Sequence, residues 1–461
     1  MNPMPNRDVV ARTLAAVWHP CTQMKLHERF SLVPIARGDG AWLVDFEGKR
    51  YLDAVSSWWV NLFGHAHPGI NAALRDQLDQ LEHVMLAGFT HAPVIALSER
   101  LAALAPGKMG HAFYASDGAS AAEIALKMAF HYWKNRGQVG KTRFVSLEGG
   151  YHGETIGALA VTDVAIFRDA YGPLLRESFK VPFPKARHPA GEGSRHPADE
   201  KSRHPGLDPG SRLGPGLRRD DEEVLEKLFA QRHGEIAAFI VEPLVQGASG
   251  MRMYDASYLR RARELCTQYD VLLIADEIMT GFGRTGTMFA CEQAGIAPDF
   301  LCLSKGITGG YLPLSCVLTT DTVYGAFYDD DVARGFLHSH SYTGNALACR
   351  AALAVLDLFE EGGVIEANRE KAARFTALAA PIAAHASVRD FRHLGMIWAF
   401  EVESGDQDFA RRAFQQALER GVLLRPIGNT VYFMPPYVVE DSEFQLLVDT
   451  ALEIIEANAS R

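Results

Sequence analysis

The sequence has no long apolar run and no excess of positive charge, and each absence removes a class of protein. No stretch approaches the roughly 20 consecutive apolar residues that cross a bilayer, so we expect no membrane span. Lysine and arginine number 46 against 56 acidic residues, and the net charge of -10 argues against nucleic acid as a main partner. Residues 1–5 lack the charged-then-apolar pattern of a secretory signal, so we expect a cytoplasmic protein.

Cysteine is also scarce. The 6 cysteines are scattered, and no two form a Cys-x-x-Cys pair, so we expect reduced thiols rather than a disulfide framework. His-x-His pairs occur at 65–67 and 338–340, but no cluster of further cysteine or histidine accompanies either pair. We therefore expect a structural role for these histidines and no metal site.

With 461 residues, the chain exceeds the size at which a single hydrophobic core stops growing, so two lobes are expected. From about residue 85 to 340, helical patterns alternate with short apolar segments, which predicts an α/β fold with a mostly parallel sheet covered by helices. The expected helices cover 94–104, 120–135, 222–232 and 256–269, and the expected strands cover 112–115, 143–146, 237–241, 271–275, 300–303 and 314–319.

The remaining segments predict a smaller α+β domain. We expect residues 1–70 to join it, residues 71–344 to form the large domain, and residues 345–461 to form the small domain itself. We expect residues 1–25 to be irregular, and residues 68–81 and 364–384 each to form a helix.

One segment breaks the alternation. Arg-His-Pro occurs three times within residues 186–219, among crowded prolines and glycines and without apolar periodicity. We predict a flexible surface insertion with no part in catalysis. A histidine-rich metal tract is the alternative.

Two charged residues follow apolar strands. Lys305 comes after the run 301–303 and precedes a glycine-rich turn, and Asp276 ends the strand expected at 271–275. A desolvated lysine loses its proton readily and suits a Schiff base, although a surface loop would also accommodate Lys305. A carboxylate at the carboxyl end of a strand is placed to face a ligand, or to cap a helix.

Three further stretches fit a flat, phosphorylated ligand. Gly118 and Ala119 open a helix whose free N–H groups would suit a phosphate. Tyr151 lies in a glycine-rich turn from which it could cover a ring. Trp58 and Trp59, beside two serines, suit a stacking wall, and the alternative is that they pack in the core.

The order of these stretches resembles the class III, or ω-type, aminotransferases of pyridoxal-phosphate fold type I. The resemblance covers nearly the whole chain apart from 186–219, and 276–286 is among its most specific segments. It implies a pyridoxal 5'-phosphate cofactor and a homodimer with shared active sites. Its motifs are Gly-Ala-Ser at 118–120, Gly-Tyr-His-Gly at 150–153, Glu-Pro at 242–243, Asp-Glu at 276–277 and Ser-Lys-Gly at 304–306.

The resemblance implies a role for each matching residue. Lys305 would hold the cofactor covalently and move the substrate proton, and Asp276 would pair with the pyridine nitrogen. Gly118 and Ala119 would bind the phosphate from one subunit. Tyr151 would stack on the ring as a catalytic, cofactor-binding and substrate-binding residue. Ser341 would reach the phosphate from the partner subunit.

Stretches 18–20, 56–59 and 424–437 resemble those members of the family that transfer nitrogen from S-adenosylmethionine to 8-amino-7-oxononanoate, giving 7,8-diaminononanoate in biotin biosynthesis. Trp58, Trp59, Arg425 and Tyr432, with Tyr151 and Lys305, would then contact substrate, and Arg425 would bind a carboxylate.

Alternatives remain open. Another class III activity would use an ω-amino acid or a diamine with pyruvate or 2-oxoglutarate, or lysine as the donor. A non-catalytic cofactor-binding protein is disfavoured because Lys305 and Asp276 are both present. Two departures from the family matter: Cys21 stands where a tyrosine is common, and His340-Ser341 replaces Pro-Thr. Glu154 stands where an aspartate is common.

Overall fold

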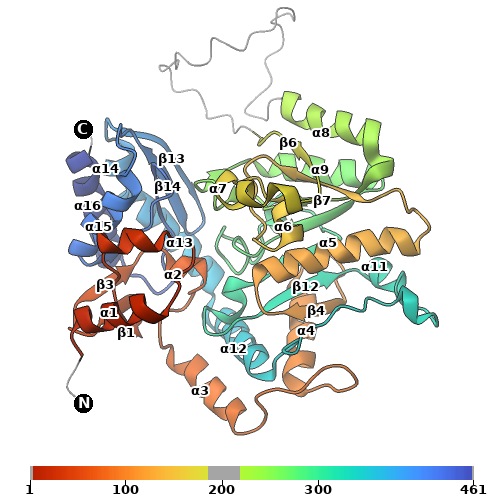
Figure 1. Cartoon of the computed structure of the whole chain (residues 1–461), viewed down its shortest axis with the longest axis horizontal. Coiled ribbons are helices and arrows are strands. Elements are labelled where there is room, and N and C mark those ends of the chain that lie inside the picture. The colour runs from red at the N-terminus through yellow and green to blue at the C-terminus, as the bar shows by residue number, and fades with distance from the viewer. Residues whose placement is uncertain (1–3, 185–218, 459–461) are drawn as a thin grey trace, which may run out of the picture.

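The computed structural model describes residues 4–184 and 219–458. Figure 1 shows the first and last parts of the chain together on the left, and the middle of the chain as a second lobe on the right. The insertion predicted at 186–219 lies outside the described residues, except for Arg219, which begins helix α8.

The large lobe is built on a seven-stranded sheet in the order β4-β12-β11-β10-β7-β5-β6. Strand β12 runs antiparallel to both of its neighbours, and every other pairing in this sheet is parallel. The predicted mostly parallel α/β sheet is therefore confirmed. The strands are β4 (His111–Ala115), β5 (Arg143–Leu147), β6 (Phe179–Val181), β7 (Ile236–Val241), β10 (Leu272–Asp276), β11 (Phe300–Leu303) and β12 (Ser315–Thr319).

Helices cover both faces of this sheet, and successive residues of one strand point to opposite covers. Ile274 of β10 packs in the cluster that contains helix α5 (Gly118–Asn135). Its neighbour Leu273 packs in the cluster that contains helix α9 (Ala256–Gln268). Because both faces are covered, β7, β10, β11 and β12 are buried throughout.

The smaller lobe combines segments from both ends of the chain. Strand β15 near the C-terminus pairs in parallel with β3 of the N-terminal hairpin, in the sheet β1-β2-β3-β15, and an antiparallel sheet β13-β14-β16 lies in the same lobe. This pairing supports joining the N-terminal segment to the small domain, and the boundaries at 70 and 344 stay a prediction. The strands are β1 (Ile35–Asp39), β2 (Trp42–Asp45), β3 (Arg50–Asp53), β13 (Val388–Leu394), β14 (Ile397–Val402), β15 (Val422–Leu423) and β16 (Thr430–Phe433).

The other helices connect and cover these sheets, and a short hairpin, β8 (Val245–Gln246) with β9 (Arg252–Met253), follows β7. Within the described residues, none of the helices combines the length and the apolar composition that a bilayer crossing requires. These helices are α3 (Pro68–Leu78), α4 (Ala92–Leu104), α6 (Ile156–Val161), α7 (Ala165–Arg168), α8 (Arg219–Arg232), α10 (Cys291–Ala294), α11 (Asp321–Gly325), α12 (Ala346–Gly362), α15 (Phe409–Glu419) and α16 (Asp441–Asn458).

Two expectations about local structure were wrong. Residues 1–25 contain helix α1 (Asn6–Ala16), which has no buried residue and therefore little of the apolar pattern that marks a core helix. The helix expected at 364–384 is divided into α13 (Val364–Leu378) and α14 (Ala380–Ala383). Pro381 lies in the first turn of α14, where its missing N–H costs least.

Candidate active site

Lys305 lies directly after strand β11, at the start of a short 3-10 turn (Lys305–Thr308). Its backbone is held in the left-handed region at a φ of 49°. The side chain is half-buried, and its amine lies 4.6 Å from the centre of the Trp59 ring. Among the described residues, the amine has neither an ion-pair nor a hydrogen-bond partner. Burial lowers the pKa of Lys305 to about 8, and the negative charges of Asp276 and Glu242 oppose this shift.

Asp276 lies at the carboxyl end of the neighbouring strand β10, as predicted. One of its carboxylate oxygens is 2.7 Å from His152 Nδ1, and the other accepts the backbone N–H of Ile278 at 3.2 Å. Both His152 and Asp276 are buried. In the described part of the chain His152 Nε2 is buried without a partner. Sequence reasoning missed His152, and only its place beside Tyr151 could have signalled it.

Glu242 provides a second buried carboxylate at the end of strand β7. It accepts the backbone N–H of Tyr151 at 3.0 Å and that of Gly247 at 3.0 Å, so it connects two loops at this edge of the sheet. Burial and the neighbouring charge of Asp276 raise the pKa of Glu242 to about 8. The sequence interpretation assigned it no role beyond its place in the motif order.

Tyr151 lies in the loop between these two carboxylates. Its hydroxyl donates to Glu154 Oε1 at 2.8 Å, and its ring meets Phe167 edge-on at 5.4 Å. Burial raises the pKa of Tyr151, and the hydrogen bond to Glu154 and the charges of Glu154 and Asp276 act in the same direction.

The start of helix α5 reaches the same edge. The Asp117 side chain accepts the backbone N–H of Ser120 at 2.9 Å, and the Asp117 carbonyl accepts that of Ala121 at 3.1 Å. Within the described residues, the N–H groups of Gly118 and Ala119 have no partner, so they are free to bind an anion. A Cβ on Gly118 would lie 2.9 Å from Ile278 Cγ2, so this helix start packs against the residues that follow Asp276.

The predicted substrate residues form a second connected group. Trp59 is buried, and its indole N–H donates to the Tyr432 hydroxyl at 3.0 Å, so it packs in the core and also faces Lys305. Trp58 is 42% exposed, and the Arg425 guanidinium lies 4.6 Å from the centre of its ring. The two tryptophans therefore lie between Lys305 and an exposed arginine.

Ser341 is the one predicted site residue that the chain does not bring into this set. It is exposed, and its carbonyl accepts a hydrogen bond from His83 Nε2 at 2.7 Å. Among the described residues, its hydroxyl has no partner.

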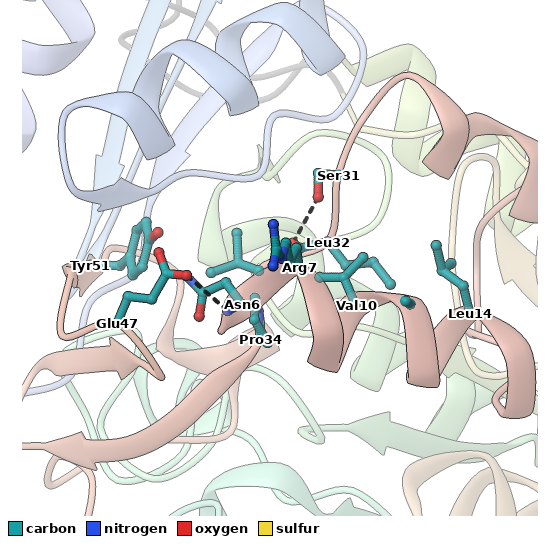
Figure 2. Close-up of a pocket in the computed structure, with 11 residues that line it drawn as sticks. Asn6, Arg7, Val10, Leu14, Ser31, Leu32, Pro34, Glu47 and Tyr51 are labelled. Atoms are coloured by element: carbon teal, nitrogen blue, oxygen red, sulfur yellow. Dashed lines mark hydrogen bonds between the residues drawn. The ribbon is translucent and has the colours of Figure 1, made fainter. Parts of the chain in front are cut away.

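A separate hollow of about 590 Å³ lies between helix α1 and residues 31–34 (Figure 2). Apolar side chains such as Val10 and Leu14 line it together with Glu47 and Tyr51 of the hairpin, and Lys305 is not among the lining residues. The described residues also contain no group of three or more His, Cys, Asp or Glu side chains placed to hold a metal ion. Asp276, Glu242, the Tyr151 loop and the start of α5 instead converge with Lys305 at one edge of the sheet, and this edge is the candidate active site.

Comparison with known proteins identifies related chains. Residues 24–456 match the family described as aminotransferase class-III. A relative from Helicobacter pylori named adenosylmethionine-8-amino-7-oxononanoate aminotransferase is 44% identical, over 97% of this chain and 98% of its own length.

Two solved structures share the fold. The Methanocaldococcus jannaschii enzyme of that same name is 34% identical with a TM-score of 0.87, over 98% of this chain and 100% of its own. An amine transaminase from an uncultivated Pseudomonas species, solved with pyridoxal phosphate bound, is 34% identical with a TM-score of 0.85, over 96% of this chain and 99% of its own.

The lowered pKa of Lys305 predicts unusual reactivity for its amine. In protein freed of bound ligands, acetylation of Lys305 should reach half its maximal rate near pH 8, because only the neutral amine is a nucleophile. In Asp276→Asn the midpoint should fall, since the lost negative charge favoured the protonated form. Peptide mass spectrometry across a pH series measures both, and a midpoint near the ordinary lysine value of about 10.4 would contradict the assignment.

Proposed function

The chain belongs to the class-III aminotransferase family, and we propose that it transfers the amino group of S-adenosylmethionine to the ketone of 8-amino-7-oxononanoate, giving 7,8-diaminononanoate for biotin biosynthesis. The observation that carries this proposal is the Lys305 amine, which in the described part of the chain has no ion-pair or hydrogen-bond partner, lies against Trp59 and is influenced by the charges of Asp276 and Glu242.

The residues at this edge fit pyridoxal phosphate. The unpaired amine of Lys305 suits the aldehyde, and the free N–H groups of Gly118 and Ala119 suit the phosphate. Asp276, oriented by His152, suits a protonated ring nitrogen, and Tyr151 suits the face of the ring. The chemistry that the bound cofactor supplies is an electron sink for the Cα carbanion and a carrier for the amino group.

Lys305 Nζ would move the proton. Because the pKa of this amine is lowered to about 8, roughly a tenth of it is neutral at pH 7 and able to accept a proton from substrate Cα and return it. The carboxylate of Asp276 cannot rotate freely, since His152 and the Ile278 N–H hold its two oxygens. The site therefore combines the Lys305 amine, which can accept and return a proton, with the Asp276 carboxylate, which is held in one orientation.

The two tryptophans and Arg425 would select the substrates. Aromatic walls bind by stacking and tolerate unlike shapes, which suits two substrates that enter in turn. The exposed guanidinium of Arg425, which lies over the Trp58 ring, is available to a substrate carboxylate.

We also propose a homodimer in which Ser341 serves the partner's active site. The loops near Ser341 expose large apolar side chains, among them Met85, Phe89, Leu337 and Tyr342, at 55%, 58%, 79% and 63%. Such a patch favours contact with a second copy, and that copy would bring a Ser341 hydroxyl to the phosphate. The six free thiols fit a reducing compartment, and we propose the cytoplasm.

The donor is tested by the first half-reaction. When cofactor-loaded protein is mixed with S-adenosylmethionine alone, the visible absorbance of the cofactor should change, and Lys305→Ala should slow this change by at least about a hundredfold. The amine transaminase neighbour motivates a parallel screen with lysine, alanine and simple amines. A response to those donors but not to S-adenosylmethionine would sink the donor assignment.

Shared active sites predict complementation. Lys305→Ala lacks the base, and Ser341→Asp places a negative charge where we propose the phosphate binds, so each homodimer should be inactive. Refolding the two variants together should restore activity, because one of the two sites in each mixed dimer then carries neither change. Activity that stays absent although mass spectrometry detects mixed dimers would exclude sharing.

A further inference from the structure

The segment that carries the two tryptophans adopts an unusual backbone. Ser56, Ser57, Trp58 and Trp59 have φ values of 51°, 46°, 71° and 74°, so α2 (Ser56–Trp59) is a left-handed turn. L-residues other than glycine pay for this conformation, and runs of such residues are rare. Strained backbone of this kind persists only where its surroundings hold it. The turn therefore needs an anchor.

Asp53 provides that anchor. Its side chain is fully buried, one oxygen accepts the backbone N–H groups of Val55 at 3.3 Å and Ser57 at 2.9 Å, and the other accepts the Ser57 hydroxyl at 2.7 Å. Charge-assisted bonds of this kind are stronger than bonds between neutral groups. One carboxylate thus holds the backbone and the side chain at the start of the left-handed turn.

His65 fixes Asp53 from the other side. Its Nε2 lies 3.0 Å from the Asp53 oxygen that accepts the Ser57 hydroxyl, and its Nδ1 lies 3.1 Å from Asn61 Nδ2. Asn61 Oδ1 accepts the Gly64 N–H at 2.8 Å, so the Asn61 amide must present its NH₂ group to His65. His65 Nδ1 is then the acceptor, and Nε2–H donates to Asp53.

The anchored turn is also joined to the active site. The Ser56 hydroxyl donates to the Met434 carbonyl at 2.7 Å, two residues beyond Tyr432. Buried Arg284, which follows Asp276 in the chain, donates to the Asn61 carbonyl at 2.7 Å. A change at Asp53 would therefore be transmitted to Trp58 and Trp59 more directly than to the cofactor residues.

We propose that Asp53 and His65 are positioning residues that hold the left-handed turn, so that Trp58 and Trp59 present a preformed wall to the substrate. Neither residue lies on that wall itself. The effect on substrate binding rests on the proposed function, whereas the anchoring of the turn does not.

The test is Asp53→Asn. The new amide can still accept the two backbone N–H groups, but its NH₂ group then faces the Nε2–H of His65, and the other His65 tautomer would clash with Asn61. We expect the KM for S-adenosylmethionine to rise about tenfold while kcat falls less than about threefold. Amide hydrogen exchange of the peptide 54–60 should accelerate, and the cofactor absorbance should stay as in the wild type.

Asp45→Asn is the matched control. Asp45 is a buried carboxylate on the same hairpin, and none of its hydrogen-bond donors belongs to the turn. The change should lower the melting temperature without altering KM or the exchange of peptide 54–60. Its donors are the Asn6 side chain, the backbone N–H groups of Glu47 and Lys49, and the Tyr51 hydroxyl.

Ser57→Ala covers the case in which Asp53→Asn does not fold. It removes only the hydroxyl bond to Asp53, so a smaller rise in KM and in exchange is expected. The proposal is overturned if the folded variants at Asp53 and Ser57 match Asp45→Asn in both readouts. If the wild type turns over no amine donor, the proposed function fails instead, and the exchange comparison still decides whether Asp53 anchors the turn.

Discussion

The structure depends on the placement of one amine where it is desolvated, lies against the Trp59 ring and, among the described residues, has no ion-pair or hydrogen-bond partner. Burial disfavours the charged form of Lys305, while the neighbouring acidic groups, Asp276 foremost, favour it, and the balance brings its pKa to about 8. A direct ion pair would have kept the amine protonated, and full exposure would have left it near the ordinary lysine value. Lys305 can therefore act both as a nucleophile and as a base near neutral pH.

The parallel sheet is what gathers the other groups around this amine. Asp276 of β10 pairs with Cys302 of β11, so Lys305 follows a short distance beyond the same edge. The carboxyl ends of three other strands lie at this same edge. Strand β4 leads to the start of α5, β5 leads to the Tyr151 loop, and β7 leads to Glu242. Ligand sites at the carboxyl edge of open α/β sheets arise in this way, because each loop contributes one or two residues.

The sequence was sufficient for most strands of the large sheet, because their apolar runs are local signals, but it did not predict β1 or β6. It placed Asp276 and Lys305 at strand ends, although the local context of Lys305 alone also fitted a surface loop. Gly118 and Tyr151 had only weak local signals, a helix start and an aromatic residue in a glycine-rich turn, and the role of Arg425 came from the family resemblance alone. Contacts such as that of His152 with Asp276, or of Asp53 with His65, join residues whose own neighbourhoods look ordinary. The left-handed turn also could not be predicted from the sequence, because the Ser-Ser-Trp-Trp stretch contains no glycine to indicate positive φ values.

The central claim is that Lys305 holds the cofactor. Borohydride reduction of the cofactor-loaded protein makes that attachment permanent, and peptide mapping then locates it. The account predicts a single modified peptide that contains Lys305. Modification of Lys180 instead, whose pKa burial also lowers to about 8, or of any other lysine, would contradict it.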